Sequence, residues 1–189
     1  MFAEAIAMTG PAYGSGHVSL EEYLRGRFES DMEFVDGLVV KRKGFGWKHS
    51  RLVTEVGAWF WEHRKLWGVD ALPSYWVKTT ANRVRMPDLC VVRRSDPVER
   101  VRVSAPLLCI EFLEPEDRME EVARRLDEFV AMGVENLWVL DPSERSAATY
   151  SRFGMKAVVG DRLEIAGTEI YLDVRETFAA LDSSGVGVE

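Results

Sequence analysis

The amino-acid sequence predicts an α/β domain in which helices flank a mixed β-sheet. Two long segments carry apolar residues at three- and four-residue spacing, which is typical of amphipathic helices, and four short apolar runs bounded by turn residues are typical of buried strands. Their order, α-β-β-β-α-β, is expected for helices packed against a sheet. In chain order the segments are 48–66, 75–80, 86–92, 107–113, 116–132 and 137–141.

A short helix and a β-hairpin are expected before this core. Ser19 and Glu22 have the spacing of a capping box, so a helix should run from there to about Phe28. The dipeptide Asp36-Gly37 favours the tight turn of a hairpin. The strands of this hairpin should be 32–35 and 38–40.

Glycine and proline mark where the later segments begin and end. Gly68 and Gly133 follow the two long helices at the position that commonly ends a helix. Pro115 opens the second of these helices with acidic residues behind it, and Pro142 ends the last strand of the core. Weaker strands are expected near 148–151, 157–159 and 169–172, and a short helix near 174–181.

Length and composition favour one soluble domain. The chain has 189 residues, of which 47% are hydrophobic and 29% charged, and we expect one domain over 18–182 between flexible tails at 1–17 and 183–189. No apolar stretch approaches the roughly 20 residues of a membrane span, and the first tail lacks the pattern of a signal peptide. We therefore expect a cytoplasmic protein without membrane contact. Cys90 and Cys109 lie in predicted strands and should be small buried hydrophobic residues.

Charged residues are segregated along the chain. The net charge of -7 argues against a surface that binds nucleic acid everywhere, but residues 37–54 hold five basic residues and no acid, whereas residues 111–128 hold eight acids and three arginines. This pattern suits a metal-lined cleft beside a basic rim, although solvated faces would give it too. The basic residues of the rim are Lys41, Arg42, Lys43, Lys48 and Arg51.

Two acidic residues lie inside predicted core strands. Glu111 is in the run 107–113, where a charge costs several kcal/mol unless a cation or hydrogen bonds compensate it. Asp88 follows Pro87 in the neighbouring run 86–92. Adjacent strands lie about 4.8 Å apart, so carboxylates on one face of the sheet can share a divalent ion such as Mg²⁺. The structural alternatives are an arginine partner for Glu111 and a turn cap for Asp88.

The same residues carry a resemblance to a known family. Pro87-Asp88 followed by Glu111-Phe112-Leu113 resembles the PD-(D/E)XK signature of restriction-endonuclease-like nucleases, whose core has the same order of helices and strands. More narrowly, residues 20–180 resemble the Uma-type family of bacterial restriction endonucleases. The most specific part is the spacing from Glu111 through Gly133 to Asp141-Pro142. Other matching residues are Glu33–Gly37, His49, Leu89, Leu107–Ile110, Pro115, Arg125, Phe129, Val134 and Leu137–Leu140.

The resemblance implies a restriction-endonuclease-like core in which Asp88 and Glu111 bind Mg²⁺ or Mn²⁺. It also implies a catalytic lysine that is usually displaced from the strand to the following helix; here the strand position is Leu113 and the helix position is Arg125. An arginine stays protonated and cannot act as a general base, but it can bind a phosphate or stabilise a transition state. Alternatively, Arg125 is only a solvated helix residue. Glu33 matches an acid of the family and is a candidate for substrate binding, where it would add a third carboxylate, unless it is a surface acid on an edge strand.

Residues near the start of the first long helix are candidates for substrate binding. His49 would contact phosphate or position the substrate, with capping or packing as the alternative. Lys48 and Trp47 belong to the basic loop and are candidates for nucleic-acid contact. His63 lies about four turns further along the helix, so it cannot share an ion with His49.

These patterns lead to a predicted function with two alternatives. The first is a Mg²⁺- or Mn²⁺-dependent endonuclease that hydrolyses phosphodiester bonds in DNA, with Asp88, Glu111 and Arg125 at the catalytic centre. The second is a catalytically inactive module that keeps the nuclease fold and binds nucleic acid or a protein partner. The third is a homodimer built on exposed apolar surface of the C-terminal strands.

Overall fold

A computed structural model describes residues 17–26, 32–42 and 45–182 of the chain. The expected tails therefore lie outside the described residues, except for position 17. The helices are α1 (Leu20–Arg25), α2 (Trp47–Trp67), α3 (Met119–Met132) and α4 (Val174–Ala179). The strands are β1 (Met32–Val35), β2 (Leu38–Lys41), β3 (Val69–Pro73), β4 (Val77–Thr80), β5 (Arg83–Arg85), β6 (Leu89–Arg93), β7 (Leu108–Phe112), β8 (Leu137–Asp141), β9 (Ser146–Ser151), β10 (Gly154–Ala157), β11 (Arg162–Glu164) and β12 (Tyr171–Asp173).

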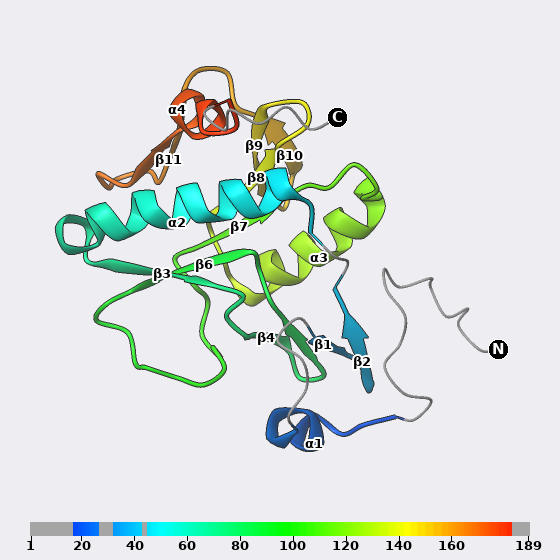
Figure 1. The fold of residues 1–189 in the computed structure, drawn as a ribbon. Coiled ribbons are helices and arrows are strands. Elements are labelled where there is room, and N and C mark those ends of the chain that lie inside the picture. The colour runs from blue at the N-terminus through cyan, green and yellow to red at the C-terminus, as the bar shows by residue number, and fades with distance from the viewer. Residues whose placement is uncertain (1–16, 27–31, 43–44, 183–189) are drawn as a thin grey trace.

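A mixed six-stranded sheet forms the centre of the fold, with strand order β10-β9-β8-β7-β6-β3. Strands β7 and β8 are parallel and are joined through α3, whereas the other neighbours are antiparallel. Helix α2 crosses one side of this sheet and α3 lies on the other (Figure 1). The predicted mixed sheet flanked by helices is confirmed.

Alternation along the strands explains why both sheet faces are covered. Successive side chains of a strand point to opposite faces, and Leu108 and Ile110 of β7 pack in the cluster that contains the buried face of α2. Cys109 packs in the second cluster, with Leu126 and Phe129 of α3. The central strands are therefore apolar on both sides, as their continuous apolar runs predict.

A smaller sheet with strand order β2-β1-β5-β4 lies beside α3 (Figure 1). The predicted hairpin of β1 and β2 is confirmed, with Asp36 at φ 50° and Gly37 at φ 91° in the turn. The predicted segment 75–80 gives β4, which belongs to this small sheet rather than to the central one. The place beside β6 is taken by β3, which was not predicted because it follows Gly68 directly and contains Asp70 in a short, half-buried edge strand.

The helix ends follow the glycine signals, whereas one helix start differs from the prediction. Gly68 and Gly133 adopt the left-handed conformation, with φ 65° and 100°, after α2 and α3. Helix α3 begins at Met119 and not at residue 116, because Glu114 and Asp117 close a separate turn in which the Asp117 carboxylate accepts the Glu114 N–H at 2.9 Å. The capping box that precedes α1 is present.

Three further expectations concern the first helix, the membrane and the two cysteines. Helix α1 ends at Arg25, before the predicted end near Phe28, because the backbone of Gly26 is already extended, with φ -63° and ψ 156°. Residues 27–28 lie outside the described residues. Within the three described ranges, no helix has the length and apolar character that crossing a bilayer requires. Both cysteines are free and buried, as predicted.

Candidate active site

The two acids of the core strands face each other. Strands β6 and β7 pair with Leu89 opposite Ile110, and one further step along the antiparallel register brings Asp88 opposite Glu111. Asp88 precedes β6 and is fixed there because its Oδ2 accepts the backbone N–H of Phe112 at 2.8 Å. Both acids are buried, with 3% and 6% of their surface exposed. The prediction that they lie on one side of the sheet is confirmed.

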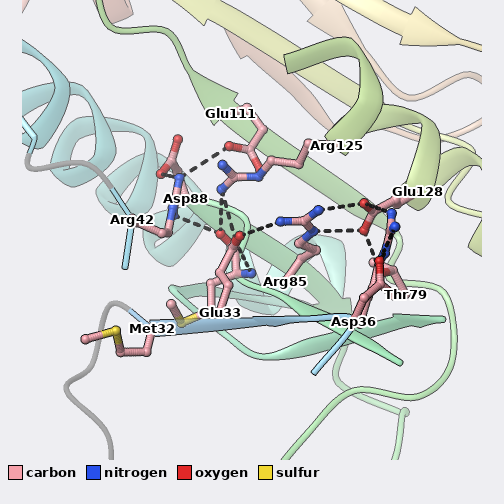
Figure 2. Close-up of polar contacts among 12 residues, drawn as sticks. Met32, Glu33, Asp36, Arg42, Thr79, Arg85, Asp88, Glu111, Arg125 and Glu128 are labelled. Carbon is pink, nitrogen blue, oxygen red and sulfur yellow. Dashed lines mark hydrogen bonds and ion pairs between the residues drawn. The ribbon is translucent and has the colours of Figure 1, made fainter. Parts of the chain in front are cut away.

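Arg42 lies between the two carboxylates. Its Nη2 atom is 2.7 Å from Oδ1 of Asp88 and 3.5 Å from Oε2 of Glu111, and its Nη1 donates to the carbonyl oxygen of Met86 at 2.8 Å (Figure 2). We predicted Arg42 only as part of a basic rim, but it is buried, with 9% of its surface exposed. Its position directly after β2 delivers it to the acids. No local sequence signal distinguishes it from the other basic residues of this run.

Arg125 of α3 approaches the same acids from the other side (Figure 2). Its Nε is 3.3 Å from Oε1 of Glu111, and its Nη2 is 3.4 Å from Oε1 of Glu33 and donates to the Met86 carbonyl at 3.1 Å. Its side chain is 22% exposed, so it lies at the edge of the buried cluster. The helix position predicted from the sequence therefore contacts Glu111, one of the two facing acids.

Glu33 is a buried member of this cluster rather than a surface acid. Its Oε2 accepts from Nη1 of Arg85 and its Oε1 accepts from the backbone N–H of Met86, both at 2.9 Å. With Arg125 as a third partner, Glu33 is held by two arginines and one amide. It therefore positions Arg125, and its carboxylate is separated from Glu111 by that guanidinium.

The cluster continues as a chain of alternating charges toward the hairpin turn (Figure 2). Arg85 joins Glu33 to Glu128 of α3, and Glu128 also accepts from Arg83 at 2.7 Å and from the hydroxyl of Thr79 at 3.1 Å. Arg83 pairs in turn with Asp36. No local sequence pattern marks Arg85, Glu128 or Arg83, because their partners lie more than 40 residues away along the chain.

The substrate-binding candidates at the start of α2 fall into two groups. His49 is buried, and its Nε2 is 3.2 Å from Oδ2 of Asp88 while its ring stacks on Phe45 at 4.2 Å. Lys48 is exposed, and Trp47 is 53% exposed, so both face outward at the start of the helix. Lys43 of the predicted basic rim lies outside the described residues.

His63 lies outside the site, as its spacing predicts. Its ring stacks on Trp67 at 4.3 Å, and its Nδ1 lies 2.8 Å from the carbonyl oxygen of Trp59. These contacts place it in an aromatic group at the far end of α2. It is a packing residue.

Burial and charge drive the pKa values of the two facing acids apart. Burial acts to raise the pKa of Asp88, but the Arg42 guanidinium and the nearby His49 ring outweigh it and hold that pKa well below its usual range. Burial raises the pKa of Glu111 to about 8, since Arg125 and Arg42 oppose it only in part and the charge of Asp88 reinforces it. Glu111 is therefore the acid whose negative charge is compensated least. For Glu33, attraction by Arg125 and by the other arginines exceeds the effect of burial and lowers the pKa to about 2.

The donors that meet here suit a divalent ion. Carboxylate oxygens are the ligands that Mg²⁺ prefers, and Oε1 of Glu111 is buried without a hydrogen-bond partner among the described residues. The guanidinium of Arg42 already stands between the acids as a cation. Across the described ranges, no three His, Cys, Asp or Glu side chains converge in the manner of a complete metal site. Asp88 and Glu111 would thus need water or phosphate oxygens to complete the coordination of Mg²⁺ or Mn²⁺.

The central sheet, its covering helices and the facing acids define a nuclease-like α/β fold. The family model of Uma2, described as a putative restriction endonuclease, matches residues 20–164. The chain belongs to this family.

A solved structure shares the fold. The crystal structure of a putative nuclease belonging to DUF820 from Anabaena variabilis matches with a TM-score of 0.75 and 18% sequence identity. The match covers 87% of this chain and 99% of that chain. At this identity the likeness concerns the arrangement of helices and strands. Among curated proteins, none matches the chain.

Proposed function

We propose that the protein is a Mg²⁺- or Mn²⁺-dependent endonuclease that hydrolyses phosphodiester bonds in DNA. The observation that carries this proposal is the convergence of Asp88 and Glu111, from neighbouring strands, on a single cationic group, the Arg42 guanidinium. Membership of a family described as restriction endonucleases supports the same reaction class.

Five residues of the site have a role in this proposal. Asp88 and Glu111 would hold the metal ion, which when bound stabilises charge on the phosphate and activates a water molecule. Arg125 remains protonated, so it binds the phosphate and offsets negative charge in the transition state rather than removing a proton. Glu33 fixes the guanidinium of Arg125 through their contact at 3.4 Å. His49 holds Asp88 in place through its Nε2.

The start of α2 would bind the DNA backbone near the acids. Lys48 is exposed there, one residue before the buried His49, and the exposed Trp47 offers a ring on which a base can stack. The free backbone N–H groups at the start of a helix attract phosphate. His49, which contacts Asp88, belongs to the first turn of this helix, so the helix start lies near the acids.

A cleavage assay with amide variants tests the proposal. Supercoiled DNA is incubated with the wild type, Asp88→Asn and Glu111→Gln in Mg²⁺, in Mn²⁺ and in EDTA. We expect nicking by the wild type only with metal, and a loss of at least about 100-fold in each variant, because removing a group that stabilises transition-state charge has effects of this size. Cleavage that survives either substitution, or that persists in EDTA, would rule out the proposed ligands.

The matched control is Asp96→Asn. Asp96 also pairs with a buried arginine, Arg102, at 2.7 Å, but it lies in the loop that follows β6. Its amide variant should therefore cleave DNA like the wild type. Loss of cleavage in this control would show that the assay reports general damage to buried ion pairs.

A catalytically inactive module that binds nucleic acid or a protein partner is the second candidate. Two observations favour it: an arginine stands where the family's lysine is expected, and each acid of the site already has an arginine partner. It predicts DNA binding by fluorescence anisotropy without hydrolysis in Mn²⁺. It also predicts no gain of cleavage in Arg125→Lys.

A further inference from the structure

The position between Asp88 and Glu111 is filled by a side chain of the protein itself. The Arg42 side chain is 7% exposed, and its guanidinium is fixed from three directions, by Asp88 at 2.7 Å, by Glu111 at 3.5 Å and by the Met86 carbonyl at 2.8 Å. The ring of Phe45 covers the same group, with the guanidinium carbon 4.8 Å from the ring centre. Arg42 is thus held in place by a built pocket.

We propose that Arg42 is a built-in competitor of the divalent ion, and that the metal site opens only when its guanidinium leaves the two carboxylates. This inference rests on the proposed function, because it requires Asp88 and Glu111 to be the metal ligands. Nothing in the sequence pattern singles out Arg42 from Lys41 or Arg51, which belong to the same basic run.

Electrostatics makes the two occupants exclusive. The carboxylate oxygen of Asp88 that contacts Arg42 is the same kind of ligand that a metal ion requires. A doubly charged ion between the acids would lie within a few ångströms of the guanidinium, and in a buried site like charges at this separation repel strongly. The acids therefore hold either Arg42 or the metal.

Competition by Arg42 should lower the apparent affinity of the protein for the metal ion by a measurable factor. When only a fraction of the molecules is competent to bind, the apparent affinity falls by that fraction, and minor conformations are commonly populated at about 0.1–10%. Removing Arg42 should therefore strengthen binding of the free metal ion by at least about tenfold. The effect concerns the free protein and does not require DNA.

Titration calorimetry with MnCl₂ alone tests the inference. Wild type, Arg42→Gln and Arg102→Gln are compared in the absence of DNA. Arg102 is the matched control, because its side chain is 5% exposed and also pairs with two acids, Asp96 at 2.7 Å and Glu99 at 3.5 Å. We expect Arg42→Gln to bind Mn²⁺ at least about tenfold more tightly than the wild type, with Arg102→Gln unchanged. Equal or weaker binding by Arg42→Gln would overturn the inference.

A second variant covers the case in which Arg42→Gln does not fold. Arg42→Lys keeps a positive charge beside the buried acids, but an ammonium group is a point charge without the planar fork that contacts Asp88 and Met86 together. It should compete less well, so Mn²⁺ binding at least about threefold tighter than in the wild type is expected. A folded Arg42→Lys with unchanged affinity would contradict the proposal.

Calorimetry, taken together with the DNA cleavage assay on the same variants, separates this inference from the proposed nuclease activity. Tighter Mn²⁺ binding by Arg42→Gln, with no DNA cleavage by any variant, would support the competition and refute the nuclease. Metal-dependent cleavage by the wild type, with no gain of affinity in either Arg42 variant, would support the nuclease and refute the competition.

Discussion

Of the two arginines that contact Glu111, Arg125 is the more exposed. Its side chain is 22% exposed, whereas that of Arg42 is 7% exposed, and it contacts both Glu111 and Glu33. A phosphate approaching the acids from outside would therefore meet Arg125 first. Because arginine does not lose its proton, its contribution is to bind and stabilise charge.

Replacing Arg125 tests whether its positive charge contributes to cleavage. We expect Arg125→Ala to lower the single-turnover cleavage rate by about 100- to 1000-fold, and Arg125→Lys to recover part of it, since a charge at this position stabilises the transition state. The control is Arg124→Ala, because Arg124 is the exposed neighbour on the same helix. Unchanged cleavage in Arg125→Ala would exclude Arg125 from the reaction.

The site residues differ in how far they could be predicted. Asp88 and Glu111 stand out because a charge within an apolar strand is expensive and demands a reason. Arg42 and Arg85 carry no such signal, since their partners are 46 and 43 residues away in the chain and are set by the packing of separate strands. The sequence thus predicts the two facing acids, Asp88 and Glu111, but not the buried Arg42 that compensates them.

Helix α3 is joined to the small sheet by apolar contacts and by ion pairs. Val77 of β4 packs in the same buried cluster as Leu126 and Phe129 of α3. Ion pairs run from Arg83 and Arg85 to Glu128, and from Glu33 to Arg125. Charges that depend on each other therefore contribute to holding these two parts of the fold together.

Removing Glu128 should expose this dependence. Glu128→Ala leaves the Arg85 guanidinium, whose side chain is 13% exposed, without its main partner on α3. Breaking a buried pair in this way costs about 3 kcal/mol or more, measured as the free energy of unfolding in urea. Glu120→Ala, at an exposed position of the same helix, should change it by about 0.5 kcal/mol or less. A similar value for both variants would contradict the role of the ion pairs.

Acid should weaken the same connection. Arginine neighbours lower the pKa of Glu33 to about 2, and they lower the pKa of Glu128 in the folded protein, in both cases against the effect of burial. A carboxyl group whose pKa is depressed by folding stabilises the fold above its unfolded pKa of about 4.3, and this contribution is lost as the pH falls toward the folded value. The unfolding free energy should therefore decline between about pH 5 and pH 2.

The variant Glu33→Gln provides the control for acid unfolding. It lacks one of the groups that must be protonated, so its stability should fall less steeply with pH than that of the wild type. Urea unfolding at a series of pH values measures both slopes. Stability that stays constant or rises on acidification of the wild type would contradict this explanation.

Strands with strong apolar runs could be predicted, and short strands at the edges could not. Strand β8 occupies the predicted residues 137–141. Its four apolar residues, 137–140, are followed by Asp141 and then by Pro142, which ends the strand. Strand β5 has three residues, of which two are arginines, and only its central Val84 is buried. Such strands owe their conformation to pairing partners that the local sequence does not reveal.

The predicted homodimer depends on one edge of the central sheet. Strand β10 lies at that edge, and the apolar residues Phe153 and Val159 beside it are 85% and 99% exposed. An exposed apolar edge favours pairing with a second copy. Light scattering should give the mass of a dimer for the wild type and of a monomer for Phe153→Lys, and a monomeric wild type at micromolar concentration would exclude this dimer.

The long helices and the apolar central strands were predictable because their patterns repeat across many residues, whereas the site depends on a few side chains from distant segments. Helix α2, strand β7, helix α3 and strand β8 follow the predicted order. The acids that they place together are the residues on which the proposed metal-dependent chemistry depends.

Anomalous diffraction from crystals soaked in MnCl₂ tests directly whether Asp88 and Glu111 bind the metal ion. We expect an anomalous peak between the carboxylates of Asp88 and Glu111, with the Arg42 side chain displaced from both. The peak should be absent from crystals of Glu111→Gln. A wild-type crystal without manganese at these carboxylates, or with manganese bound only elsewhere, would contradict the proposed metal site.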